Sequence, residues 1–300
     1  YCKAQLVELQ GRLEDLESSG IGIVAISYDS QEVLAEFAER RGITYPLLSD
    51  DDSSAITEFG ILNTVASEGM GPDRENPDVV ADVAKYVSVF GSSQLVVGTP
   101  FPGTFMLDAN GRVSSRFFEE FYRERNMTSN VMLKLGIGLS PIAAIEGTTA
   151  HLKLTAYPSN PVVSAGTRFS LAVEVEPNPD MHLYAPGAES MGYRVIGLWL
   201  APSLHFRYES VIFPESEIYH FEPLDQFVPV YQQSFTLLQD AVVEATVEAE
   251  TALEELDALT LSGAFDYQAC DDAICYPPVS VPLSFTLEIE ENDNQRATRR

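Results

Sequence analysis

Residues 265–278 read FDYQACDDAICYPP and place Cys270 and Cys275 on either side of a four-residue segment. If residues 271–274 form a hairpin loop, the two cysteines face each other across an antiparallel ladder, with Cα atoms about 4.5–5.5 Å apart. That separation lies within the range of a disulfide, so the pair can close without moving the backbone. We therefore expect Cys270 and Cys275 to be bonded, or within bonding distance, at the end of a β-hairpin.

The sequence before and after this stretch alternates with a period of two. Apolar residues alternate with polar, mostly acidic ones over residues 169–176, 243–250 and 283–290. Strands with one apolar face, separated by Pro-rich turns, predict an antiparallel, all-β sandwich over residues 151–290. Residues 137–150 contain Gly and Pro without helix periodicity and are predicted to be a linker, and residues 291–300 a flexible tail.

The N-terminal half has a different pattern, typical of an α/β domain. Four leucines between residues 3 and 18 recur at three- and four-residue steps, which predicts one face of a helix. Residues 21–28 (IGIVAISY) predict a central strand covered on both faces. The pair Asn110-Gly111 between apolar runs predicts a β-hairpin. Residues 63–97 are expected to be irregular, and a last helix is predicted from Thr128 to Gly136.

Composition excludes several classes of function. The chain of 300 residues has a formal net charge of -27 and only 18 basic residues, so we expect no nucleic-acid partner. No run of about 18 apolar residues is present, so no membrane span is expected in this segment. The four histidines lack metal-ligand spacing, and there is no phosphate-binding loop. We therefore predict neither a metal nor a cofactor.

The N-terminal half resembles the redoxins of the peroxiredoxin (alkyl hydroperoxide reductase and thiol-specific antioxidant) superfamily. The resemblance is carried by YCK at residues 1–3, which is similar to the end of a C-P-x-C motif, and by PGTF at residues 102–105, followed by Asp108 and Gly111. It implies a thioredoxin-fold domain over residues 1–136, whose first strand and first motif cysteine would precede Tyr1. It also implies that peroxide is the default substrate.

The same resemblance implies roles for two residues. Cys2 would be the resolving thiol, and Pro102 would follow a cis peptide bond and position the substrate beside the dithiol. The residues agree for Cys2, because a thiol in the first turn of a helix lies at the positive end of the helix dipole.

The C-terminal half is similar to the N-terminal periplasmic domain of the DsbD-type thiol:disulfide interchange protein. The resemblance is carried by residues 265–278, by MHLYAP at residues 181–186 and by EIY at residues 217–219. It implies an immunoglobulin-like fold and a redox-active pair, Cys270 and Cys275, that exchanges electrons with thiol partner proteins outside the cytoplasm, in the bacterial periplasm or cell envelope. Phe213 would be the cap of the pair, and Tyr184 and Tyr276 would line the site.

Two functional hypotheses follow. The first is an oxidoreductase acting on thiols, disulfides or peroxide, which we expect to be inactive as this segment because its first cysteine would precede Tyr1. In this hypothesis the two domains exchange electrons with each other. The second is a non-catalytic module that binds a partner and whose cysteines are a structural staple, as in many secreted β domains.

Overall fold

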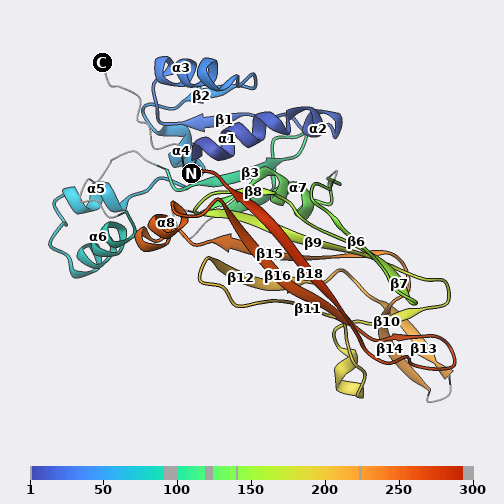
Figure 1. The fold of residues 1–300 in the computed structure, drawn as a ribbon. Coiled ribbons are helices and arrows are strands. Elements are labelled where there is room, and N and C mark those ends of the chain that lie inside the picture. Colours follow the sequence, from blue (N-terminus) through green and yellow to red (C-terminus); the bar gives the residue numbers. More distant parts are fainter. Residues whose placement is uncertain (1, 91–99, 119–123, 140, 223–224, 293–300) are drawn as a thin grey trace.

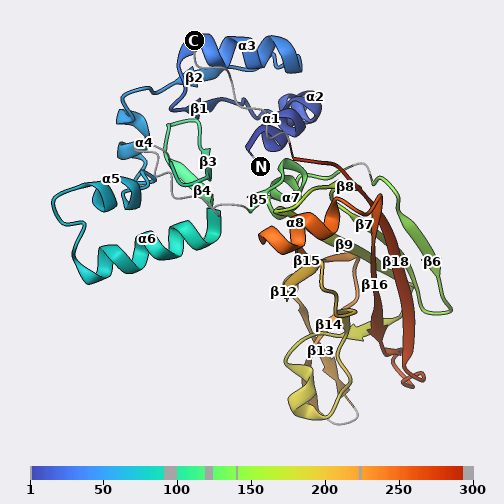
Figure 2. The same cartoon turned by 60° about the vertical axis from the view of Figure 1, so that its left-hand side comes forward.

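The structure is a computed structural model that describes residues 2–90, 100–118, 124–139, 141–222 and 225–292. It has a mostly helical N-terminal part and a long, β-rich C-terminal part (Figures 1 and 2). The helices of the N-terminal part are α1 (Cys2–Gly11), α2 (Leu13–Ser18), α3 (Gln31–Arg41), α4 (Ser54–Glu58), α5 (Val65–Met70) and α6 (Pro77–Phe90). Its strands are β1 (Ala25–Ser27), β2 (Leu47–Ser49), β3 (Gly103–Leu107) and β4 (Val113–Phe118).

The predicted first helix is present but is divided at Arg12 into α1 and α2. Its leucines pack as the periodicity predicts, against a small core on α3 and the segment after it. The buried members of that core are Phe37, Ile43 and Tyr45. The Tyr45 hydroxyl donates to the carbonyl of Leu6 at 2.8 Å, which ties α1 to this core.

Two expectations for the N-terminal part were wrong. Residues 21–28 are not a strand covered on both faces: only β1 is extended, it pairs in parallel with β2, and Ile26 is 40% exposed. Residues 63–90 are not irregular, because they contain α5 and α6. The start of α6 carries a recognisable signal, since Pro77 occupies the first turn and the Asn76 side chain accepts from the Asp78 amide at 3.0 Å. Residues 91–97 lie outside the described part.

The predicted hairpin at Asn110-Gly111 is confirmed. β3 and β4 pair antiparallel, and Gly111 adopts a φ of 75°, which favours glycine. The Asp108 carboxylate accepts from the backbone amides of Asn110 and Arg112, both at 2.9 Å, and closes the turn. No peptide bond among the described residues is cis, so the cis bond implied before Pro102 was wrong.

The β-rich part is built from three sheets. Its strands are β5 (Arg125–Asn126), β6 (Ile145–Thr148), β7 (Leu152–Pro158), β8 (Val162–Val163), β9 (Thr167–Pro177), β10 (His182–Tyr184), β11 (Gly197–Leu200), β12 (Phe206–Ile212), β13 (Glu217–Phe221), β14 (Gln226–Tyr231), β15 (Phe235–Val243), β16 (Ala258–Tyr267), β17 (Ala269–Cys270) and β18 (Val279–Ile289). Its helices are α7 (Thr128–Lys134), η1 (Ala188–Met191) and α8 (Val247–Leu253).

Two of these sheets share one hydrophobic core. The first has the order β12-β15-β9-β7-β6, with β5 beside β9, and the second has the order β11-β16-β18-β8. Side chains from both sheets, such as Val173 and Leu237 of the first and Leu261 and Phe285 of the second, belong to the same buried cluster. The sheets therefore suggest a β-sandwich. The third sheet, β13-β14-β10-β17, lies at one end of it and contains Cys270.

Two short strands lie in ranges where the sequence did not predict strands of the β-rich part. β6 lies inside the range predicted as a linker and pairs with β7. β5, inside the predicted redoxin domain, pairs in parallel with β9. These short segments were missed because their strand conformation depends on a neighbouring strand, which local periodicity does not report.

Candidate functional site

The Cys270–Cys275 pair forms a disulfide, as predicted from its spacing. The Cα atoms are 4.0 Å apart, and the two residues form an antiparallel bridge at the end of β17. The two sulfurs have different surroundings: Cys270 is 1% exposed, whereas Cys275 is an exposed residue of the loop. A molecule arriving from solvent therefore meets Cys275 first.

The loop between the cysteines is ordered by Asp271. Its carboxylate accepts from the backbone amides of Ala273 at 2.8 Å and Ile274 at 2.7 Å, and from the hydroxyl of Tyr276 at 2.8 Å. The hydrogen bonds from these amides are the main cause that lowers the pKa of Asp271, so this carboxylate stays ionised and keeps its three hydrogen-bond donors. The loop thus holds Cys275 opposite Cys270.

Aromatic side chains lie close to the disulfide. Tyr184 lies with Cys270 in a separate buried cluster, and its hydroxyl is 3.5 Å from the Cys275 sulfur. Its ring stacks on Tyr193, with ring centroids 4.3 Å apart. Burial raises the pKa of Tyr184 to about 12, so its hydroxyl is neutral at physiological pH and can donate to the sulfur.

His182 lies beside Cys270, and its ring stacks on that of Tyr219. His182 is the register partner of Cys270, is 2% exposed, and stacks on the ring of Tyr219 at 4.7 Å. Burial lowers the pKa of His182, although the charges of Asp272 and Asp271 oppose that shift. The Tyr219 hydroxyl donates to the Asp272 carboxylate at 2.8 Å, so Tyr219 connects β13 to the cysteine loop.

Two of the three aromatic residues predicted for this site lie beside the disulfide or its loop, and the third does not. Tyr184 contacts the disulfide, and Tyr276 lies beside the loop, with its ring 4.6 Å from that of His151. Phe213 instead packs against the large core of the β-rich part, not in the cluster of Cys270. Tyr219 fills the place over the cysteine loop that sequence reasoning gave to Phe213. The EIY motif of residues 217–219 carries part of the resemblance, but only the pairing of β13 with β14 and the contact with Asp272 show that Tyr219 faces the loop.

The other cysteine, Cys2, is exposed at the start of α1. The guanidinium of Arg125 donates to its sulfur, with Nη2 and Sγ 2.9 Å apart. Pro102 lies nearby: together with Gln5, Arg125 and other residues it lines a small cavity. The structure thus brings the predicted Pro102 loop to the helix that carries Cys2, with Arg125 between them. The sequence offers Arg125 as one of four candidate arginines, with Arg112, Arg116 and Arg123, but spacing alone does not show that it lies at Cys2.

The two cysteine sites lie at opposite ends of the β-rich part (Figures 1 and 2). β9 gives the scale. Its first residue, Thr167, pairs with Arg125, which contacts Cys2. Its last residue, Pro177, pairs with Leu152, next to the His151 ring that contacts Tyr276 beside the disulfide. A strand of 11 residues spans roughly 30 Å, so the two sites are separated by a distance of this order.

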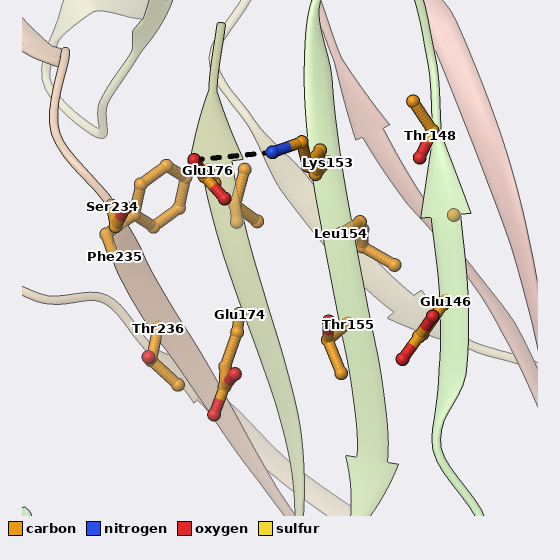
Figure 3. Close-up of a pocket in the computed structure, with 12 residues that line it drawn as sticks. Glu146, Thr148, Lys153, Leu154, Thr155, Glu174, Glu176, Ser234, Phe235 and Thr236 are labelled. Atoms are coloured by element: carbon orange, nitrogen blue, oxygen red, sulfur yellow. Dashed lines mark ion pairs between the residues drawn. The ribbon is translucent and has the colours of Figure 1, made fainter.

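One surface depression of the described residues lies away from both cysteine sites. It crosses β6, β7, β9 and β15 on their exposed face, where Lys153 and Glu176 pair at 3.7 Å (Figure 3). Within the described part of the chain, no group of three or more His, Cys, Asp or Glu side chains could hold a metal ion. No described helix is both long and apolar enough to cross a membrane.

The described part of the chain thus holds a disulfide with one exposed cysteine, Cys275, and a separate cysteine beside an arginine. In a comparison with known families, residues 1–116 match the AhpC/TSA family, and residues 153–285 match the family "Thiol:disulfide interchange protein DsbD, N-terminal". The chain thus joins a thioredoxin-like redoxin domain to a β-rich domain of the DsbD N-terminal type. Both matches support a redox role.

The chain is similar to curated peroxiredoxins over a short segment. It is 39% identical over 59 residues to a putative peroxiredoxin of Mycobacterium tuberculosis (strain ATCC 25618 / H37Rv), covering 20% of this chain and 38% of that protein. It is 33% identical over 60 residues to peroxiredoxin Bcp of Escherichia coli (strain K12), covering 20% of this chain and 38% of that protein. The chain therefore spans less than half the length of these relatives.

Two solved structures are similar to part of the chain. One is the DsbD N-terminal domain of Neisseria meningitidis in the reduced form, 14% identical, covering 40% of this chain and 78% of that one, with a TM-score of 0.28. The other is the N-terminal periplasmic domain of ScsB from Proteus mirabilis, 13% identical, covering 48% of this chain and 49% of that one, with a TM-score of 0.32.

Proposed function

We propose that the β-rich domain exchanges its disulfide with thiol partner proteins and that Cys275 is the sulfur they attack. The observation that carries this proposal is the contrast between the two cysteines: the residue Cys275 is exposed, and Cys270 is 1% exposed. Thiol–disulfide exchange needs a nearly linear approach of a thiolate to the attacked sulfur, so access decides which sulfur reacts. The match to the DsbD N-terminal family supports this chemistry.

The exchange then has two balanced steps. A partner thiolate attacks the sulfur of Cys275, a partner–Cys275 bond forms, and the Cys270–Cys275 bond breaks with Cys270 leaving as a thiolate. A second thiolate of the partner then attacks the partner sulfur that is bonded to Cys275. A disulfide forms within the partner, and Cys275 leaves as a thiolate. The pair gains two electrons and the partner dithiol is oxidised to a disulfide; the reverse sequence oxidises the pair.

The aromatic neighbours have roles in this scheme. The Tyr184 hydroxyl, 3.5 Å from the Cys275 sulfur, can donate to that sulfur when it is released as a thiolate. Tyr219, bonded to Asp272 and stacked on His182, covers the loop from one side and limits access to bulky reagents. We therefore assign to Tyr219 the shielding role first expected of Phe213.

The redoxin domain supplies a second thiol site. We infer that Cys2 takes part in thiol chemistry as the resolving thiol, attacking a disulfide or an oxidised cysteine, which the AhpC/TSA match and the Arg125 contact support. Because roughly 30 Å separates the two sites and exchange requires sulfur–sulfur contact, each site of this conformation serves external partners rather than the other site. A disulfide that forms and persists favours an extracytoplasmic location.

The proposal is tested first by comparing single-cysteine variants. In a Cys2→Ser background, Cys270→Ser leaves Cys275 as the only thiol, and Cys275→Ser leaves Cys270. Their rates of mixed-disulfide formation with oxidised glutathione are measured by mass spectrometry. We expect the Cys275 thiol to react at least about tenfold faster, because Cys270 is buried. Equal rates, or a faster Cys270, would refute the assignment of the attacked sulfur.

A second experiment separates exchange from a structural staple. The Cys2→Ser protein is equilibrated with glutathione buffers of known potential, and the fraction of reduced pair is measured by alkylation. Structural disulfides have reduction potentials below about −300 mV and remain oxidised in buffers of higher potential. An exchanging pair should instead become reduced in buffers above about −300 mV. If the pair remains oxidised throughout that range, the redox proposal for this domain fails.

A further inference from the structure

Arg125 belongs to the β-rich part by its backbone and to the Cys2 site by its side chain. It lies on β5, which pairs in parallel with β9, and its amide donates to the carbonyl of Gly166 at 2.9 Å. Its side chain extends to the sulfur of Cys2, with Nη2 and Sγ 2.9 Å apart. Arg125 is only 3% exposed, so its charge lies in a largely dehydrated setting next to an exposed thiol.

The strand that carries Arg125 is held by ion pairs of the β-rich part. The preceding residue, Glu124, is buried and pairs with Arg168 of β9 at 2.9 Å and with Arg207 of β12. Each guanidinium group pairs with one oxygen of the Glu124 carboxylate, so the residue before Arg125 is held against β9 and β12.

Helix α1 is fastened to the same region. The carboxylate of Glu8 accepts from the amide of Thr128 at 2.5 Å, from the hydroxyl of Ser129 at 2.9 Å and from the Asn160 side chain at 2.7 Å. Gln5 donates to the carbonyl of Asn126 at 2.8 Å. Cys2 and Arg125 therefore face each other because two distant parts of the chain are docked, and neither part builds this pair alone.

We propose that Arg125 is a positioning residue through which the β-rich domain sets the reactivity of Cys2 and directs it toward anionic reagents. A guanidinium N–H favours negative charge on the sulfur and on a group that approaches it, and its effect is larger where water is excluded. The inference rests on the proposed function, in which Cys2 is a reactive thiol. It adds that the β-rich domain completes the thiol site of the redoxin domain.

The test uses two alkylating reagents of similar size and different charge. The chain has three cysteines and two form the disulfide, so without reductant Cys2 is the thiol that iodoacetate and iodoacetamide modify. The ratio of the two rate constants reports local charge at the sulfur, because a change in exposure alone alters both rates alike. Arg125→Gln should lower the iodoacetate-to-iodoacetamide ratio by about tenfold, and Arg125→Lys should retain most of it.

Controls separate this effect from others. Arg194→Gln removes the same charge from an exposed position of the β-rich part and should leave the ratio unchanged. Glu124→Gln keeps Arg125 but weakens the ion pairs of its strand, so the ratio should fall partly. An unchanged ratio in a folded Arg125→Gln protein overturns the inference. If that variant does not fold, an unchanged ratio in Glu124→Gln overturns it. If Cys2 of the parent protein reacts with neither reagent, the proposed function of Cys2 fails instead.

Discussion

Reduction of the Cys270–Cys275 disulfide should destabilise the β-rich part only modestly. The cysteines are 5 positions apart in sequence, so the disulfide closes a loop of six residues. For a loop this short, the loss of chain entropy in the unfolded state corresponds to about 2 kcal/mol at 25 °C. The shared core contains many fully buried side chains, and each contributes roughly 1.5–3 kcal/mol. The reduced domain should therefore remain folded.

The assay can observe this part of the molecule alone. The chain has one tryptophan, Trp199, which lies on β11 and pairs with Ala264 of β16. Urea unfolding of the Cys2→Ser protein, followed by Trp199 emission with and without a phosphine reductant, gives the two free energies of unfolding. We expect the reduced form to be less stable by about 2 kcal/mol. In a Cys270→Ala/Cys275→Ala control, the reductant should change nothing.

One result would refute the reasoning. If reduction abolishes the cooperative transition, or lowers the free energy of unfolding by more than about 5 kcal/mol, the disulfide is required for the fold. The pair would then be a structural staple, and the exchange mechanism would lose its basis, because a domain that unfolds on reduction cannot return to the oxidised state without refolding.

Three further predictions concern the neighbours of the two sites. Tyr219→Phe, which loses the bond to Asp272, should speed reduction of the disulfide by dithiothreitol several-fold; an unchanged rate would show that Tyr219 does not shield it. Burial holds the pKa of His182 below its ordinary value of 6.5, so the free energy of unfolding should fall as the pH is lowered from about 6.5 through the folded-state pKa. His182→Asn should remove this pH dependence, whereas the exposed control His220→Asn should retain it. Glu8→Gln should loosen the docking of α1 and increase amide hydrogen exchange at Thr128 and Ser129, whereas the exposed control Glu14→Gln should not; equal exchange in both variants would contradict the docking role.

Much of the β-rich part could be predicted from the sequence because the determining interactions are local. The spacing of Cys270 and Cys275 implies a tight loop and a bond, and both are present. The alternation of apolar and polar residues over residues 169–176 places one face of β9 in the core, as observed for Phe169, Leu171 and Val173. The strand predicted from the same alternation over residues 243–250 was wrong: β15 ends at Val243, and Thr246 caps the helix α8. Asn110-Gly111 specifies its turn through backbone conformations that neighbouring residues alone determine.

Tertiary structure alone decided how distant segments meet. The exposure of β1 depends on which strands lie beside it, and an apolar run such as IGIVAISY does not report its neighbours. Whether Phe213 or Tyr219 covers the cysteine loop depends on the pairing of β13 with β14. The contact between Arg125 and Cys2 joins residues 123 positions apart. Periodicity and motif spacing describe only what lies within a few residues along the chain. Contacts between segments that are distant in sequence form when separate cores and sheets dock, and the sequence pattern of one segment does not encode where the other will lie.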